Sequence, residues 1–239
     1  MRLLVTRPED DAQSLAGFLR VRGHEPVVAP IMDVDFPPGP PIPLEGVQGV
    51  LATSANGIRA ASLRTERRDL TIYAVGPQTA EAARQAGFTV VISAEGDANA
   101  LVELVAREAD PAKGILLHAA GAETAGRLRQ ALQGRGFRVE TAVLYEALPV
   151  AKLPAIAEEA LRANVLDGVL LFSPRSAKIF ATLVSDAGLA SQCARLVAFC
   201  ISAATAEALE SLTFERVAIA GAPNQDAILD LIPPPEPAP

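Results

Sequence analysis

Short aliphatic runs alternate with longer amphipathic, alanine-rich stretches along almost the whole chain. Continuous apolar runs are typical of strands buried on both faces of a parallel sheet, and apolar positions spaced three or four apart are typical of helices. The pattern predicts strands at residues 3–6, 47–53, 72–75, 90–93, 115–118, 139–144, 169–172, 197–201 and 217–220. It predicts helices at residues 10–22, 78–85, 98–108, 176–185, 204–211 and 226–231, and a further helix that ends at residue 133. Because the two kinds of element alternate, we expect an α/β fold built on parallel sheets.

The second half of the chain repeats the order of the first half and part of its sequence. The matched segments are residues 3–23 with 116–136, 53–56 with 172–175, 78–82 with 204–208, and 91–101 with 218–228. Since the matches keep their order, we infer an ancient duplication. Two similar parallel-sheet domains of the flavodoxin or Rossmann type follow from it, with a ligand cleft between them.

Proline-containing segments separate parts of this pattern. Residues 36–44 and 148–154 are predicted to be extended connectors, through which the chain would cross between the domains twice. Residues 233–239 are almost all proline and predict a disordered tail.

Charge narrows the classes of ligand. The chain carries 21 basic and 28 acidic residues, which gives a formal net charge of −7. This balance argues against a general nucleic-acid binder, because phosphate contacts need a basic face. A small polyanion is still compatible with the sequence, since a few arginines and helix N-termini can line one positive cleft.

The residues that define membrane proteins, disulfide proteins and metal sites are sparse. The N-terminus has no signal-peptide core, and no run is long and apolar enough to cross a bilayer, so we expect no membrane association. Cys193 and Cys200 suggest neither a disulfide framework nor a metal knuckle and indicate a cytoplasmic protein. His24 and His118 each lack a second ligand at a suitable spacing. We therefore expect no metal and no cofactor.

Small or hydroxylic residues occupy most strand-to-helix junctions, as in residues 53–57 and 172–176. Such junctions lie at the carboxyl ends of parallel strands, where open α/β sheets bind ligands and helix N-termini offer N–H donors. The same residues are also ordinary helix N-caps, which is the favoured interpretation of any single junction. Their repetition in both halves favours ligand binding. The absence of a GxxxxGK[ST] loop, or of a GxGxxG motif after a strand, argues against nucleotide-dependent chemistry.

Candidate reactive groups are few. No GxSxG elbow occurs, and neither histidine has a clear serine or cysteine partner, so nucleophilic catalysis has little support. Tyr145 follows a predicted strand, where it could donate a proton to a leaving hydroxyl or simply pack with a satisfied hydroxyl. Arg7, Arg59 and Arg175 lie at junctions, where they could bind carboxylates or solvate helix ends.

Several segments, taken together, resemble the landmarks of uroporphyrinogen-III synthases. They are Leu4-Val-Thr-Arg-Pro-Glu9, Leu51-Ala-Thr-Ser-Ala-Asn56, Ala74-Val-Gly-Pro-Gln-Thr-Ala80, Val143-Leu-Tyr-Glu146, Leu171-Phe-Ser-Pro-Arg-Ser176 and Thr205-Ala206. Their order and spacing carry the resemblance, which runs from Arg2 to Ile232. One departure is Ile201-Ser202-Ala203, which replaces a glycine-containing turn often seen in the family.

The resemblance implies a lyase that acts on hydroxymethylbilane, a linear tetrapyrrole with acetate and propionate side chains. The family removes water from the terminal hydroxymethyl group, inverts ring D through a spirocyclic intermediate and closes the macrocycle without metal or organic cofactor. It also implies a cytoplasmic monomer, which could receive its substrate from the preceding enzyme of the pathway. Its domains would be residues 1–35 with 150–232, and residues 45–147.

Individual residues follow from the same resemblance. Tyr145 matches a family tyrosine that assists departure of the hydroxyl. The expected substrate-binding residues are Thr6, Arg7, Thr53, Ser54, Gly76, Thr79, Ser173, Arg175 and Thr205. The alternative is a non-catalytic two-domain protein that binds an anionic metabolite, for which saturable binding without turnover is expected.

Overall fold

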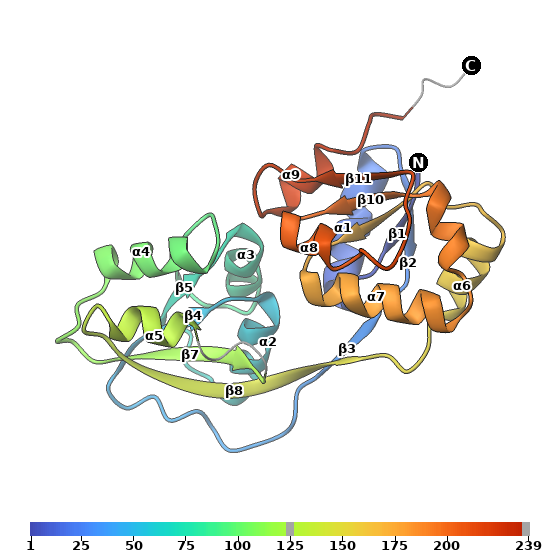
Figure 1. Ribbon diagram of the computed structural model, residues 1–239. Helices are drawn as coiled ribbons and strands as arrows, with labels where there is room; N and C mark the ends of the chain where they lie inside the picture. Colours follow the sequence, from blue (N-terminus) through green and yellow to red (C-terminus); the bar gives the residue numbers. More distant parts are fainter. Residues whose placement is uncertain (123–126, 236–239) are drawn as a thin grey trace. The chain divides into compact units, whose positions relative to one another are not determined.

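The computed structural model describes residues 1–122 and 127–235, and it falls into two compact units (Figure 1). Unit 1 comprises Met1–Asp33 and Leu148–Pro239, and unit 2 comprises Val34–Ala147. Of the two segments expected to be connectors, residues 36–44 fall within unit 2 and residues 148–154 within unit 1.

Unit 1 is built on a five-stranded parallel sheet with the order β11-β10-β9-β1-β2. Its strands are β1 (Arg2–Val5), β2 (Glu25–Val28), β9 (Gly168–Leu171), β10 (Val197–Cys200) and β11 (Arg216–Ile219). Its helices are α1 (Glu9–Val21), α6 (Ala155–Arg162), α7 (Pro174–Asp186), α8 (Ala203–Glu207), α9 (Gln225–Leu229) and the 3-10 helix η1 (Ala190–Arg195).

Alternating side chains of this sheet enter two separate cores. Leu3 and Val5 of β1 pack with α1 and α9 on one face, and Leu4 packs with α6, α7 and η1 on the other (Figure 1). Since both faces are covered, every position of the central strands must be apolar, which explains the continuous aliphatic runs in the sequence.

Unit 2 contains a six-stranded sheet with the order β3-β8-β7-β4-β5-β6. Its strands are β3 (Met32–Asp35), β4 (Val47–Ala52), β5 (Thr71–Ala74), β6 (Val90–Ser93), β7 (Ile115–Gly121) and β8 (Arg138–Pro149). The helices are α2 (Ala55–Arg64), α3 (Pro77–Gln85), α4 (Ala98–Glu108) and α5 (Arg127–Gln133). The cores place α2 and α3 on one face and α4 and α5 on the other. The predicted α/β fold with parallel sheets is therefore confirmed.

The strand registers show that the two sheets are built alike. The order β6-β5-β4-β7-β8 in unit 2 corresponds to β11-β10-β9-β1-β2 in unit 1. Gly49 of β4 and Gly168 of β9 occupy equivalent places, and a Cβ on either would lie within 3.0 Å of an aromatic ring on the next strand, Tyr73 or Phe199. Corresponding glycines thus admit corresponding rings in both sheets.

Some elements differ from those predicted. The edge strands β2 and β3, helices α2 and α6, and η1 were not predicted, and β7 and β8 extend beyond the predicted ends at residues 118 and 144. Partly exposed edge strands carry proline or acidic residues, as β2 and β3 do, and these interrupt the apolar pattern. Of the predicted tail, residues 233–235 have no regular structure, and residues 236–239 lie outside the described residues. The helix predicted to end at residue 133 corresponds to α5, which ends there.

Candidate functional site

Two of the predicted site residues of unit 2, Ser54 and Tyr145, are in contact where β4 ends and α2 begins. Ser54 is the N-cap of α2, and its Oγ accepts a hydrogen bond from the Gly57 N–H at 3.2 Å. The same Oγ lies 2.7 Å from the hydroxyl of Tyr145 on β8. The cap and the candidate proton donor are thus joined directly, although 91 residues separate them in the chain.

Tyr145 was expected at the end of a strand, but it lies inside β8. Its side chain is 7% exposed, and the ring of Phe36 lies 6.4 Å away between centroids. A Cβ on Gly121 would lie 2.8 Å from Cζ and 3.0 Å from the hydroxyl oxygen of Tyr145. Only glycine at position 121 therefore leaves room for the phenol in this orientation.

His118 of β7 is a functional candidate that was weighed from the sequence only as a metal ligand and as the partner of a nucleophile, and was set aside in both roles. Its ring is fully buried, and its Nε2 lies 3.4 Å from Thr53 Oγ1 at the end of β4. Burial lowers the pKa of His118 from its ordinary value of 6.5 to about 4, so the ring is neutral at pH 7. A lone imidazole in an aliphatic strand was the signal that could have identified it.

Gly76 and Thr79 lie at the first turn of α3, which follows β5. Gly76 is the N-cap in extended backbone, and a Cβ there would meet only the Gly96 carbonyl oxygen at 3.8 Å among the described neighbours. Packing against these neighbours therefore does not demand glycine, although Gly76 itself is buried. Thr79 is 5% exposed. Next to this region, Arg59 of α2 donates a hydrogen bond to Asn56 Oδ1 at 2.6 Å.

In unit 1, Thr6 and Arg7 are engaged within their own unit. The buried Thr6 hydroxyl donates to the carbonyl of Leu170 at 3.0 Å. The Arg7 guanidinium lies 2.7 Å from the carboxylate of Asp11 and 4.6 Å from the centroid of the Phe172 ring. The structure therefore shows a partly neutralised arginine stacked on an aromatic ring at this end of the sheet.

Ser173, Arg175 and Thr205 lie at two helix starts of unit 1. Ser173 forms a capping box with Ser176, and Arg175 follows within the first turn of α7. Thr205 is fully buried in α8, and its hydroxyl lies 3.0 Å from the hydroxyl of Ser202, the N-cap. Serine caps occur in both units, so the cap interpretation and the ligand interpretation apply to the same residues.

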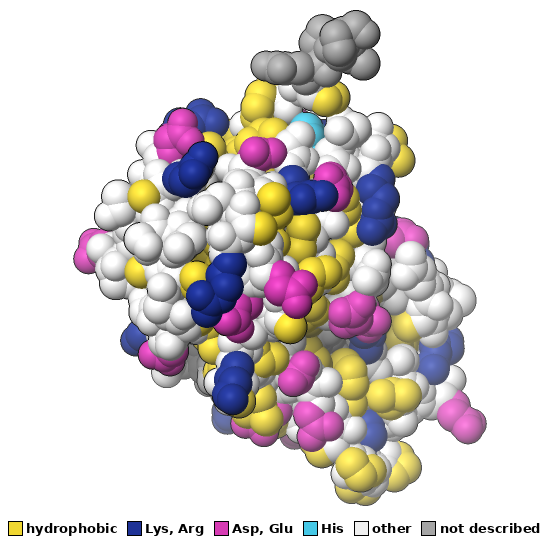
Figure 2. All heavy atoms as spheres, turned by 90° about the vertical axis from the view of Figure 1, so that its right-hand side faces the viewer, with side chains coloured by type: hydrophobic (Ala, Val, Ile, Leu, Met, Phe, Trp, Pro, Cys, Tyr) yellow, Lys and Arg dark blue, Asp and Glu magenta, His cyan; other side chains and the backbone are white. Residues whose placement is uncertain are grey.

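Other reactive groups have no place in this chemistry. Burial raises the pKa of the free thiols Cys193 and Cys200 to about 11, so both are protonated and unreactive at pH 7. Within residues 1–122 and 127–235, no three His, Cys, Asp or Glu side chains gather as a metal site would require. Figure 2 shows acidic and basic side chains interspersed on the face that it presents, without a broad basic surface.

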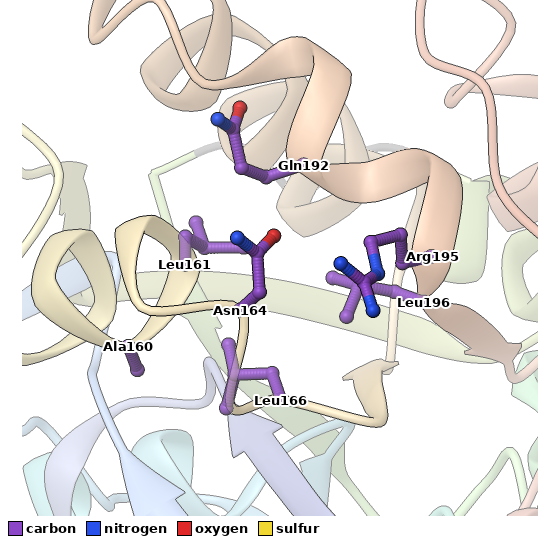
Figure 3. A pocket seen from close by; sticks show the side chains of 7 residues that line it. All are labelled: Ala160, Leu161, Asn164, Leu166, Gln192, Arg195 and Leu196. Atoms are coloured by element: carbon purple, nitrogen blue, oxygen red, sulfur yellow. The ribbon is translucent and has the colours of Figure 1, made fainter.

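A small pocket in unit 1 lies at the opposite end of the sheet from the predicted site residues. It is lined by Ala160, Leu161, Asn164, Leu166, Gln192, Arg195 and Leu196, which come from α6, the turn after it and η1 (Figure 3). Leu166 and Leu196 precede β9 and β10, so the pocket lies at the amino ends of these strands. Its empty volume is about 180 Å³, open solvent included.

Comparisons with known proteins agree with this arrangement. A uroporphyrinogen III synthetase structure from Helicobacter pylori is 18% identical, with a TM-score of 0.63 and coverage of 97% of this chain and 98% of that chain. A mutant uroporphyrinogen III synthase structure from Thermus thermophilus is 19% identical, with a TM-score of 0.52 and coverage of 96% of each chain. At these identities the structures show a shared two-domain α/β fold.

Family membership comes from the sequence itself. No curated protein matches the chain by sequence. Within the described part of the chain, no helix is long and apolar enough to cross a membrane. The family model described as uroporphyrinogen-III synthase HemD matches residues 13–230, which include parts of both units. This chain therefore belongs to the uroporphyrinogen-III synthase family, whose members are lyases of tetrapyrrole biosynthesis that act on a small-molecule substrate.

Proposed function

We propose that this chain converts hydroxymethylbilane into uroporphyrinogen III, with loss of water and inversion of ring D. The observation that carries the proposal is the family match over residues 13–230. The fold agrees with it, because the hydroxyl and N–H donors of both sheets gather at strand carboxyl ends.

Substrate binding rests on groups that suit carboxylates. The N-termini of α2, α3 and α7 offer backbone N–H groups and the positive ends of helix dipoles. The proposed substrate-binding residues are Thr6, Arg7, Thr53, Ser54, Gly76, Thr79, Ser173, Arg175 and Thr205. Many weak donors on two sheets suit a flexible substrate with many acidic side chains better than one strong cationic cluster would.

Tyr145 is proposed to assist the departure of the terminal hydroxyl. Its O–H gives a proton to that oxygen as the carbon–oxygen bond breaks, and water leaves. Ser54 holds the phenol oxygen at 2.7 Å and is itself fixed as a helix cap, so the position of the acid is set by α2. The linear substrate closes unaided to the symmetric type I isomer, so the enzyme must chiefly hold the chain in the conformation that inverts ring D.

The organisation of the protein is proposed on the same basis. Residues 1–35 with 150–232 would form one domain and residues 45–147 the other, joined through residues 36–44 and 148–154. We propose a cytoplasmic monomer that needs no metal or organic cofactor, binds no nucleic acid, and receives its unstable substrate from the enzyme that makes it.

The test is an isomer analysis. Fresh hydroxymethylbilane is supplied to the purified protein, the products are oxidised, and type I and type III porphyrins are separated by chromatography. Type III in excess over a protein-free control, without added metal or nucleotide, supports the proposal. Only type I at the spontaneous rate, from protein shown to be folded, overturns it.

A further inference from the structure

Three polar side chains lie on neighbouring strands of unit 2, within β7 and β8 and directly after β4. His118 of β7 lies between β8 and β4 (Figure 1), where Thr141 is its direct partner in the register and Thr53 follows β4. His118 Nε2 lies 3.4 Å from Thr53 Oγ1. The buried atoms His118 Nδ1 and Thr141 Oγ1 have no hydrogen-bond partner among the described residues.

The equivalent positions of unit 1 are apolar. In the shared strand order, the registers match His118 with Val5, Thr141 with Val28, and Thr53 with Phe172. Since Val5 is fully buried in its core, the fold itself does not require a polar group at this place. Polar groups in a covered sheet cost free energy, so polar groups confined to one copy of a duplicated scaffold indicate a role beyond folding.

The proton on the ring decides what these three groups can do. A threonine hydroxyl has one hydrogen to donate and two lone pairs to accept with. If His118 carried its proton on Nδ1, the bare Nε2 would accept a hydrogen bond from the Thr53 hydroxyl. The single hydrogen of that hydroxyl would then be used, and Thr53 could not donate to a carboxylate. If the proton is on Nε2, the ring donates to Thr53 Oγ1, and the Thr53 hydrogen is left for a ligand.

Thr141 offers a group that can support the form with the proton on Nε2. Its hydroxyl hydrogen and the Nδ1 lone pair are complementary, and no direct bond joins them. Parallel register partners lie on one face at about 5 Å between Cβ atoms, close enough for a bond through one water molecule. A hydroxyl that donates to Nδ1 holds the proton on Nε2. The direction of donation then runs from Thr141 through His118 to Thr53.

We propose that His118 is a positioning residue, which as the Nε2–H imidazole donates to Thr53 Oγ1 and so directs the Thr53 hydroxyl hydrogen toward a substrate carboxylate. The inference rests on the proposed function for the identity of that carboxylate. His118 itself does not touch substrate.

The ring proton is tested without any turnover. Protein labelled with 15N-histidine gives a long-range proton–nitrogen spectrum in which a protonated ring nitrogen is distinguished from a bare one, and His24→Gln identifies the signals of His118. We expect a neutral ring with the proton on Nε2, and a shift of the Nε2 signal in Thr53→Val. In Thr141→Val the Nε2–H population should fall. A proton on Nδ1 in the unmodified protein overturns the inference.

Matched variants test the consequence for the substrate. The side-chain nitrogen of glutamine reaches the place of Nε2, whereas that of asparagine reaches the place of Nδ1. His118→Asn should raise KM for hydroxymethylbilane by about 5- to 20-fold with little change in kcat, as expected when binding common to ground and transition states is lost. His118→Gln should restore most of the affinity. Thermal unfolding of both variants controls for folding.

The outcomes separate the two proposals. Equal KM values in His118→Asn and the unmodified protein, with both folded, overturn the inference. So does an increase in KM for His118→Asn that His118→Gln does not reduce. A protein that makes no type III product fails the proposed function, and the ring-nitrogen spectra still decide the position of the proton.

Discussion

The two units share a scaffold and differ in the groups placed on it. Gly49 and Gly168 admit equivalent aromatic rings, and five strands of unit 2 follow the order of the five strands of unit 1. At the carboxyl ends, however, unit 2 joins Ser54 to Tyr145, whereas the equivalent serine of unit 1, Ser173, forms a capping box within its own helix. The two units thus share packing positions, whereas the positions that can carry chemistry differ.

The difference is strongest inside the sheets. Unit 2 buries an imidazole at the place where unit 1 buries a valine. In unit 1 the arginine at the strand end is held by a carboxylate and an aromatic ring, so its charge is already partly engaged. Unit 2 therefore carries a buried imidazole and a phenol at places where unit 1 carries apolar residues or an arginine that is already engaged.

Replacing His118 by valine, the residue that unit 1 has at the equivalent position, should make the stability of the protein much less sensitive to acid. Because the pKa of His118 is about 4 in the folded chain and about 6.5 when unfolded, the unfolded state binds the proton first. The free energy of unfolding is therefore unaffected by the titration of this group above pH 6.5 and falls by about 3 kcal/mol as the pH falls toward 4.

His118→Val tests this in urea unfolding followed between pH 4 and 7. The variant should lose less stability over this range than the unmodified protein, by about 3 kcal/mol. Equal pH dependence of the two proteins would contradict the assignment of a depressed pKa to His118.

Alanine at Gly168 or Gly49 should destabilise the unit that contains it, and the two losses of stability should differ. A Cβ on Gly168 would meet both the Phe199 ring and the Val197 carbonyl oxygen at 2.8 Å. A Cβ on Gly49 would meet the Tyr73 ring at 2.6 Å and the Thr71 carbonyl at 3.1 Å. Since backbone yields less than a ring, Gly168→Ala should cost about 3 kcal/mol and Gly49→Ala about 2 kcal/mol. Chemical denaturation measures both, and the reverse order would show that the ring is the less yielding neighbour.

The sequence predicted the scaffold better than the site. Central strands such as β1 and β9 are buried on both faces, so their residues form unbroken aliphatic runs. Strand β2 was missed because Glu25 and Pro26 begin it and its residues are partly exposed. Helix α6 follows Pro154 directly, and the region before it had the composition of a connector.

The contacts of the site depend on strand order, which local patterns do not contain. Ser54 and Tyr145 were each singled out, but their hydrogen bond exists only because β8 and β4 flank β7. His118 and Thr141 became neighbours through the same pairing. Tyr145 was expected at a strand end because the apolar run stops near it, whereas β8 continues through polar residues to Pro149.

Removing the hydroxyl of each tyrosine of unit 2 in turn should show that Tyr145, and not Tyr73, contributes to catalysis. Tyr145→Phe should lower kcat by about 10-fold, since a general acid that assists an already feasible departure lies at the low end of such effects. The binding constant for substrate should change less. Tyr73→Phe is the matched control, because Phe199 occupies the equivalent place in unit 1 and the Tyr73 ring packs in a core. Unchanged kcat in Tyr145→Phe would remove Tyr145 from the mechanism.

The smallest effects should come from the equivalent caps. Ser54→Ala and Ser173→Ala each remove a side chain that accepts a helix N–H, and each should cost about 1 kcal/mol of stability. Ser54→Ala should also lower kcat by a factor of about 3, because the Tyr145 hydroxyl loses the group that fixes it. Ser173→Ala should act on KM instead. Steady-state kinetics of the pair at equal folded fraction measures the contrast, and identical kcat values would mean that the Ser54–Tyr145 hydrogen bond serves only the folding of unit 2.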